Sequence, residues 1–247
     1  MRKPEPATRR SISDRFLLGG TVEDVTPLTP RTRRIRIGGV GGAGARELVW
    51  RPGQHVRVLV GDPGTARAWM TGFRDLLRSY SVWDHDARAG TLDLCVLDHG
   101  DDGPGVRWAR RVRVGQRVAF TRPEGRVVLD RHAPHHLFVG DETASVAFRP
   151  MLQTLPATAR VHGVIGVAAP EDRLPLPRAD ELHWIYGRPL ADAVHALDLP
   201  AEPGVAYVAG EAHTCQAVRR HLTRTLGWPR RSVIVKPFWA PGRRGLD

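Results

Sequence analysis

The sequence predicts a two-domain fold in which an antiparallel β-barrel precedes an α/β domain with a parallel sheet. Up to about residue 130, six short runs with strand character are separated by turn residues, a pattern typical of a small antiparallel barrel. From about residue 131 onward, strand-like runs alternate with helix-like runs, which is typical of a parallel sheet with helices on both faces. The length of 247 residues is sufficient for two domains that each bury a core.

The barrel is expected over residues 15–130, after a polar and basic segment, 1–14, that is expected to be flexible. Several strands alternate polar and apolar residues, as strands with one buried face do. In chain order the expected strands are Thr21–Val25, Arg33–Ile37, His55–Val60, Ser79–Trp83, Thr91–Leu97 and Arg117–Phe120. Glycine-rich stretches at residues 38–44 and 61–64 are expected to be loops.

The α/β domain is expected over residues 131–247, with its last residues forming an aromatic tail. Strands are expected at His135–Val139, Arg160–Val167, Glu181–Tyr186, Val205–Ala209 and Ser232–Val235. Helices are expected at Thr143–Leu155, Leu190–Leu197 and Ala212–Leu226. Thr143 is the expected N-cap of the first helix, and Gly227 is expected to end the last one.

The net charge of +11 comes almost entirely from arginine, because Lys3 and Lys236 are the only lysines. Two interpretations are open: an anionic partner, or arginines scattered over the surface. Most arginines occur singly or in pairs, and no long basic block contains interleaved aromatic residues. A nucleic-acid partner is therefore not expected.

The remaining composition indicates a soluble, cytoplasmic protein without a metal site. Cys95 and Cys215 are too few for a disulfide framework or a zinc cluster, and the 11 dispersed histidines show no metal-ligand spacing. The basic N-terminus lacks the apolar segment of a signal peptide, and no run of about 18 apolar residues could span a membrane. A monomer is the default expectation.

Two motifs in the barrel region combine polar side chains with backbone suited to a ligand. In Arg78-Ser79-Tyr80-Ser81, strand alternation puts Arg78 and Tyr80 on one face, where they could bind an anionic group and a ring. A polar outer strand face is the simpler interpretation. The second motif is the glycine-rich turn Asp98-His99-Gly100-Asp101-Asp102-Gly103-Pro104-Gly105, with a helix expected to begin near Pro104. Free N–H groups at such a helix start can hold a phosphate, and a plain tight turn is the alternative. Asp101 and Asp102 count against an anion at this place unless they cap the helix.

Three further motifs lie at the ends of strands in the α/β domain. Gly140-Asp141-Glu142-Thr143-Ala144 and Gly210-Glu211-Ala212 each join a strand to a helix, which is where such domains bind nucleotides. Neither is a G-x-G-x-x-G sequence, and an N-cap carboxylate is the simpler explanation of the first turn. The third motif, Lys236-Pro237-Phe238-Trp239, carries an aromatic pair that could cover a cofactor or anchor the end of the chain.

Together and in this order, the five motifs resemble those of the siderophore-interacting protein family, within the ferredoxin–NADP reductase superfamily. The family carries an R-x-Y-[ST] strand, an H-G-x-x-G-P-x-x-x-W-A loop, a G-D-E-T-A turn, a G-E-A turn and a C-terminal aromatic pair. Here these motifs are found at Arg78–Ser81, His99–Ala109, Gly140–Ala144, Gly210–Ala212 and Phe238–Trp239. The resemblance spans roughly residues 15–242.

The resemblance implies that FAD is the cofactor, and it implies roles for three groups of residues. The flavin end would be held by Arg78, Tyr80, Ser81 and Val82 and covered by Trp239. The pyrophosphate would be wrapped by the loop that contains His99, Gly100, Gly103, Pro104 and Trp108. Asp141 and Thr143 would lie at the cleft between the domains, and the reduced nicotinamide would be faced by Gly210, Glu211 and Ala212.

Three positions depart from the family's pattern. Trp83 stands where the family commonly has an arginine, so one phosphate contact would be missing or supplied by another residue such as Arg107. The family's G-P-x-G turn reads Arg122-Pro123-Glu124-Gly125 here. Phe238 replaces a tyrosine in the terminal pair, which removes a hydroxyl group and keeps the ring.

The activity implied by the resemblance is reduction of a ferric siderophore. NAD(P)H would reduce the FAD, and single electrons would pass to Fe(III), releasing iron as Fe(II). Lys236 is the expected contact with an anionic siderophore. A reduced ferredoxin is an alternative electron donor. Two other functions stay open: a flavin reductase that serves as the electron-transfer partner in a biosynthetic pathway, and a cofactor-free siderophore-binding module, which Trp83 would favour.

Overall fold

A computed structural model describes residues 17–40, 48–61, 76–100 and 103–242 of the chain. The segment 1–14, predicted to be flexible, and residues 41–44 and 62–64 of the predicted glycine-rich loops lie outside these ranges. Within the described residues, no helix is long and apolar enough to cross a membrane. In the same residues, no group of three or more His, Cys, Asp or Glu side chains could hold a metal ion.

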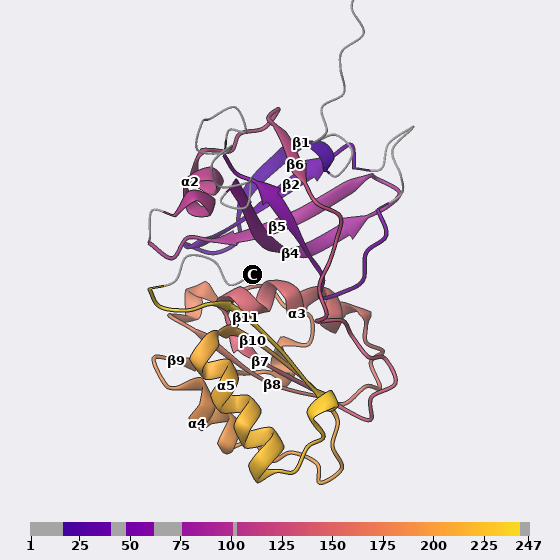
Figure 1. Cartoon of the computed structure of the whole chain (residues 1–247), viewed down its shortest axis with the longest axis vertical. Helices are drawn as coiled ribbons and strands as arrows, with labels where there is room; N and C mark the ends of the chain where they lie inside the picture. Colours follow the sequence, from indigo (N-terminus) through magenta and orange to yellow (C-terminus); the bar gives the residue numbers. More distant parts are fainter. Residues whose placement is uncertain (1–16, 41–47, 62–75, 101–102, 243–247) are drawn as a thin grey trace, which may run out of the picture.

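The N-terminal part of the chain forms the closed antiparallel barrel that the sequence predicts, with strand order β1-β2-β5-β4-β3-β6 (Figure 1). Its strands are β1 (Leu18–Pro27), β2 (Thr32–Gly38), β3 (His55–Leu59), β4 (Leu77–Asp86), β5 (Thr91–Leu97) and β6 (Arg117–Phe120). Inward-facing side chains such as Ile35, Leu94 and Phe120 are fully buried and fill the barrel. Helix α2 (Pro104–Arg111) follows β5 and packs Trp108 and Ala109 against this core.

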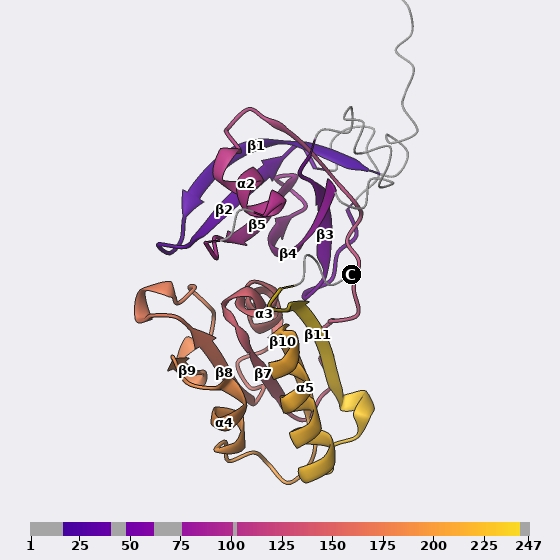
Figure 2. The ribbon, with the colours of Figure 1, turned by 60° about the vertical axis from the view of Figure 1, so that its left-hand side comes forward.

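The C-terminal part forms a five-stranded parallel sheet with the order β11-β10-β7-β8-β9 (Figure 2). Its strands are β7 (His136–Asp141), β8 (Val161–Val167), β9 (His183–Tyr186), β10 (Val205–Glu211) and β11 (Val233–Trp239). The chain runs from β7 outward to β8 and β9, then returns to the other side of β7 for β10 and β11. The strand order therefore reverses between β7 and β10, and sheets of this kind bind ligands at the carboxyl ends of the strands beside that point.

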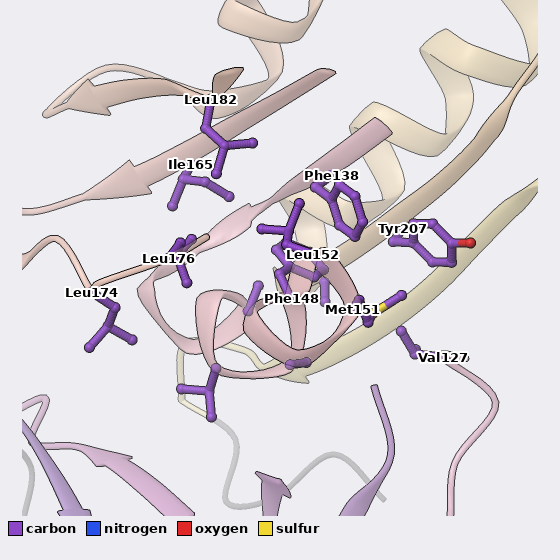
Figure 3. Close-up of a cluster of buried hydrophobic side chains, with 14 of the residues drawn as sticks. Val127, Phe138, Phe148, Met151, Leu152, Ile165, Leu174, Leu176, Leu182 and Tyr207 are labelled. Atoms are coloured by element: carbon purple, nitrogen blue, oxygen red, sulfur yellow. The ribbon is translucent and has the colours of Figure 1, made fainter. Parts of the chain in front are cut away.

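Helices cover both faces of the sheet, as predicted. Helix α3 (Glu142–Thr154) lies on the face nearer the barrel (Figures 1 and 2). The cluster between α3 and the sheet joins Phe138 and Tyr207 of the strands to Phe148 and Met151 of the helix (Figure 3). Helices α4 (Leu190–His195) and α5 (Ala212–Arg220) cover the opposite face through a separate cluster.

Several element boundaries differ from the predictions, and three of these differences concern the ends of elements that carry predicted motifs or caps. The prediction of Thr143 as N-cap is wrong: α3 begins one residue earlier, and the Asp141 side chain is its N-cap. The aromatic pair is not a tail, because β11 continues to Trp239, which pairs with Glu211 of β10. Pro237 is tolerated within this strand because β11 is at the edge of the sheet. Helix α5 ends at Arg220 and continues as a π-helical turn before Gly227.

The barrel and α3 share a hydrophobic cluster. Trp83 of β4 and Cys95 of β5 are each 4% exposed and belong to the same cluster as Phe148 and Met151 of α3. The guanidinium carbon of Arg149, also on α3, lies 4.7 Å from the centre of the Trp83 ring, and an Arg149 N–H donates to the Trp83 carbonyl oxygen at 3.0 Å. Trp83 therefore packs the barrel against α3, the helix that covers the parallel sheet. This packing explains why a tryptophan stands at this position.

Candidate functional site

On β4, strand alternation brings Arg78 and Tyr80 to the first turn of α2. A Cβ added at Gly105 would lie 2.5 Å from the Tyr80 hydroxyl oxygen and 3.4 Å from Cγ of Arg78. The Tyr80 and Trp108 rings lie 5.6 Å apart. Burial raises the pKa of Tyr80, so the phenol is neutral at physiological pH and can donate a hydrogen bond. The predicted shared face of Arg78 and Tyr80 is confirmed, and Gly105 allows their close approach to the helix.

The other two β4 residues assigned to the flavin end differ in burial. The Val82 side chain is fully buried in the barrel core, and its backbone N–H donates to the Gln54 carbonyl oxygen at 3.1 Å. Ser81 is half-buried and pairs with His55 of β3. A ligand on the α2 side of β4 would therefore contact Arg78 and Tyr80 directly.

The loop between β5 and α2 is anchored at its start by an ion pair. Both carboxylate oxygens of Asp98 accept N–H groups of Arg110 at 2.6 Å, and this pairing lowers the pKa of Asp98 to about 2. The Gly100 N–H also donates to Asp98, at 3.1 Å, and Gly100 has φ 86°, a left-handed conformation that glycine adopts without strain. His99 is exposed in this turn, and residues 101–102 of the motif lie outside the described residues.

Helix α2 begins in a way that suits an anion. Its N-cap is Gly103, which has no side chain to accept the first N–H groups, and Pro104 starts the helix as predicted. No acidic residue lies in its first turn, and a Cβ added at Gly103 would meet nothing within 4 Å. Among the described residues, which exclude 101–102, no side chain caps the first N–H groups of α2, so these groups and the positive end of the helix dipole could receive a phosphate group.

At the point where the strand order of the parallel sheet reverses, Asp141 accepts hydrogen bonds from four residues. Its Oδ1 accepts the N–H and hydroxyl of Thr143 and, at 3.4 Å, the N–H of Ala144. Its Oδ2 accepts the N–H of Glu211 at 2.9 Å and the indole N–H of Trp239 at 2.8 Å. Four of the predicted site residues, Asp141, Thr143, Glu211 and Trp239, are thus brought together around one carboxylate.

Glu211 has the same role for α5 that Asp141 has for α3. Its two carboxylate oxygens accept the N–H groups of His213 and Thr214 at 2.7 and 2.6 Å. Although burial opposes it, these N–H groups hold the pKa of Glu211 below its ordinary value. The preceding Gly210 has φ 116°, and a Cβ there would collide with the Asp141 carboxylate, so this position requires glycine.

An ion-pair cluster that the sequence did not predict joins the barrel to this edge of the sheet. Arg31, between β1 and β2, contacts Glu142 at the start of α3 and donates to Asp172 at 3.1 Å. Glu142 also accepts the N–H of Ala168, which follows β8, at 2.7 Å. Burial raises the pKa of Glu142, while the Ala168 N–H and Arg31 oppose this rise. The second oxygen of Asp172 is buried without a hydrogen-bond partner among the described residues.

The two aromatic residues of β11 differ in burial. Trp239 is 43% exposed, although its indole N–H is bound by Asp141. Phe238 is partly buried against the α3 cluster together with Ile234. Lys236 alternates in phase with both, so its half-buried side chain lies on the α3 side of the sheet, the side that faces the barrel.

The position where an arginine was expected cannot provide a phosphate contact, because Trp83 is buried in the shared cluster. Arg107, suggested as its replacement, is exposed in the first turn of α2, next to the open helix start. In the turn at residues 122–125, which departs from the family's G-P-x-G pattern, Glu124 forms an ion pair with Arg57 at 2.6 Å, and Gly125 has φ 118°. The turn thus keeps a glycine at the position that needs one.

Comparisons with known proteins match both parts of the chain. A family model described as "Siderophore-interacting FAD-binding domain" matches residues 21–127, and one described as "Siderophore-interacting protein" matches residues 133–242. The ferric vibriobactin reductase ViuB of Vibrio cholerae is 28% identical over 176 residues, which cover 67% of this chain and 65% of ViuB. The chain thus spans slightly less than two thirds of that relative's length.

Solved structures match over a larger share of the chain. The siderophore-interacting protein SipS from Aeromonas hydrophila is 30% identical with a TM-score of 0.78, and the match covers 93% of both chains. A siderophore utilization protein from T. fusca is 27% identical with a TM-score of 0.75, covering 94% of this chain and 95% of that one. Both the barrel and the parallel sheet therefore have counterparts in these proteins.

Proposed function

The chain belongs to the siderophore-interacting protein family and carries that family's FAD-binding domain, and from this premise we propose that it is an FAD-dependent, NAD(P)H-linked reductase of ferric siderophores. The observation that carries the proposal is the open N-terminus of α2, which lies beside Arg78 and Tyr80 in the matched FAD-binding domain. Reduction would release the metal as Fe(II), which oxygen-rich chelators hold less tightly than Fe(III).

The residues present fit FAD at this position. The uncapped N–H groups that follow Gly103 would bind the pyrophosphate, with Arg107 adding a positive charge from the first turn. Arg78 and the neutral phenol of Tyr80 would contact the flavin end, and the exposed ring of Trp239 would cover it. Bound FAD supplies the conversion between two-electron donors and one-electron acceptors, while the chain orients the reactants and limits access of water.

Lys236 is the residue we assign to the siderophore. Its side chain lies on the barrel-facing side of the sheet, and a protein with net charge +11 would attract an anionic chelate. At low salt, Lys236→Ala should raise the KM for an anionic ferric chelate and leave kcat nearly unchanged. Arg231→Ala is the matched control, because it removes one positive charge from an exposed position just before the other end of β11. Equal KM values for the two variants would contradict the assignment.

The first experiment is an absorption spectrum of the purified protein, recorded before and after anaerobic addition of NAD(P)H with a ferric chelate and a ferrous trap. Flavin bands near about 370 and 450 nm that bleach and then recover as Fe(II) appears would support the proposal. Bands that bleach with reduced ferredoxin but not with NAD(P)H would show that ferredoxin is the electron donor. A protein that shows no flavin bands even after FAD is added would refute the reductase.

A further inference from the structure

Three helices begin at the candidate site, and their first turns differ in what accepts the N–H groups. At α3 the acceptor is the Asp141 carboxylate, and at α5 it is the Glu211 carboxylate. At α2 the N-cap is Gly103, which offers no side chain. Within the part of the chain that the structure describes, the one of these three helix starts without a carboxylate cap therefore belongs to the FAD-binding barrel.

The two carboxylate-capped helices are the ones that flank the reversal of strand order. In doubly wound sheets, a dinucleotide places its diphosphate there, because unpaired N–H groups and the helix dipole favour an anion. Here Thr143 and Ala144 donate to Asp141, and His213 and Thr214 donate to Glu211. A diphosphate at this place would have to displace a bound carboxylate and would meet its negative charge.

Two more carboxylates increase the negative charge of the same edge. Glu142 lies in the first turn of α3, and Asp172 lies beyond the end of β8. Among the described residues, Arg31 is the cation that forms ion pairs with them, and it pairs with both. Even when Arg173, stacked on the Trp184 and Tyr186 rings, and Lys236 of β11 are counted with Arg31, the four carboxylates leave this edge with a net negative charge, which disfavours a ligand that carries two phosphates. Helix α4, which starts after β9, has six residues and does not adjoin the reversal point.

We propose that the α/β domain recognises the hydride donor through its dihydronicotinamide ring and gains no binding energy from the diphosphate. The inference rests on the proposed function and specifies which part of the donor is bound. The contacts left for the donor at this edge are ring contacts, for which the 43% exposed Trp239 is available, rather than phosphate contacts.

The first test compares NADH with reduced nicotinamide riboside, which keeps the dihydronicotinamide ring and lacks both phosphates and the adenosine. Anaerobic reduction of the FAD-loaded protein is followed by absorbance, and we expect the two kcat/KM values to agree within about threefold. A diphosphate held by helix N–H groups would make the truncated donor worse by about 10- to 100-fold, given the usual strength of hydrogen bonds to charged groups. A loss of that size would overturn the inference.

The second test does not depend on electron transfer. ADP-ribose carries the diphosphate and adenosine without the nicotinamide, and calorimetric titration into the FAD-loaded protein should show no binding at millimolar concentration. Binding in the micromolar range would overturn the inference. If dithionite reduces the bound FAD but neither nicotinamide donor does, the electron donor of the proposed function is wrong. The ADP-ribose titration would still decide whether the protein recognises the diphosphate.

A substitution of Glu211 tests whether its negative charge disfavours the diphosphate. Glu211→Gln removes the charge and keeps one oxygen that accepts an N–H of α5, while its NH₂ group loses the second of these two bonds. The KM for NADH should fall by about three- to tenfold, and that of the truncated donor should stay the same. Glu171→Gln is the matched control, because it removes an exposed carboxylate of the segment after β8 and should change neither value. If Glu211→Gln shifts both donors equally, the carboxylate acts on the nicotinamide half and the proposal is wrong.

Discussion

The indole N–H of Trp239 donates to Oδ2 of Asp141 at 2.8 Å, and this bond ties the end of β11 to the end of β7 across the intervening β10. The same oxygen accepts the N–H of Glu211, so the ends of three strands meet at one atom. The other oxygen caps α3. The orientation of the exposed indole is therefore set by the residue that starts the helix facing the barrel.

Asp141→Asn should destabilise the protein and release Trp239. The amide can still cap α3 with its oxygen, but its NH₂ group would then face two donors, the Glu211 N–H and the Trp239 indole. Leaving these buried or half-buried groups unsatisfied should cost about 1–3 kcal/mol, measured by urea denaturation. Trp239→Phe removes one donor and keeps a ring, so it should cost less. If the two variants lose equal stability, the carboxylate has no role beyond the indole bond.

Gly105→Ala should disturb the flavin end of the barrel. The new Cβ would lie 2.5 Å from the Tyr80 hydroxyl oxygen, and moving this half-buried ring should cost about 1–3 kcal/mol of stability and weaken FAD binding. Gly103→Ala is the comparison, because its Cβ meets nothing within 4 Å and its φ of −67° suits alanine. We expect the free energy of unfolding of the Gly103→Ala apoprotein to lie within about 0.5 kcal/mol of the wild-type value.

The same pair of variants tests the phosphate site. If phosphate oxygens approach the start of α2, the methyl group of Gly103→Ala occupies their space and should lower FAD affinity without lowering apoprotein stability. Titration of the apoprotein with FAD, followed by flavin fluorescence, measures this. Unchanged FAD affinity in Gly103→Ala would place the pyrophosphate elsewhere.

Arg31→Ala should destabilise the protein more at neutral pH than at acidic pH. In the wild type, burial raises the pKa of Glu142, so the folded protein binds this proton more tightly than the unfolded chain does. The stability associated with that proton is fully present below the ordinary pKa of 4.5 and is lost as pH rises through the folded value. Without Arg31 the folded pKa rises further, so the difference from the wild type grows with pH.

We expect this difference to reach about 1–3 kcal/mol at pH 8 and to be smaller at pH 5, measured by urea denaturation at both pH values. Arg57→Ala is the control, because its partner Glu124 is 46% exposed and the pair should contribute less than about 1 kcal/mol. A pH-independent loss in Arg31→Ala would show that the guanidinium acts by packing alone.

Trp83→Ala should lower the free energy of unfolding by about 3–5 kcal/mol, because it leaves a cavity in the hydrophobic cluster that the barrel shares with α3. Trp83→Phe keeps a ring beneath Arg149 and should cost less than half as much. Trp83→Arg would restore the family's common residue, yet it would place a second guanidinium beside Arg149, so we expect lower stability and no gain in FAD affinity. Tighter FAD binding in Trp83→Arg would mean that this side chain can reach the cofactor.

The sequence predicted the order and type of the elements well where alternation and turn residues were clear. The predicted bounds of β5 and β6 are those of the structure. Strand β4 is longer than predicted because Asp84, His85 and Asp86 pair with β5 after an irregularity in register. These polar residues do not show the alternation by which a strand is recognised in the sequence. Strand β11 is longer because pairing with β10 outweighs the presence of Pro237. Both differences arise from partners in other strands.

The candidate site was predicted in part for a similar reason. Motifs that join a strand to a helix can be read locally, and Asp141, Thr143, Glu211 and Trp239 do meet in the structure. Arg31 was not predicted, because Glu142 and Asp172 lie 111 and 141 residues away and no local pattern marks the pairing. Trp83 was identified as a departure from the family's pattern, but its packing on α3 depends on the arrangement of the two sheets.

The cluster shared by Trp83, Cys95 and α3 has a consequence for how the molecule loses its structure. A hydrophobic boundary of this kind couples the melting of its two sides, because opening either one exposes the apolar surface of the other. Backbone amides of β4, β5 and α3 should therefore become accessible to solvent deuterium in a single cooperative event, at one denaturant concentration. We therefore expect the barrel and the parallel sheet, which are separate in topology, to unfold together.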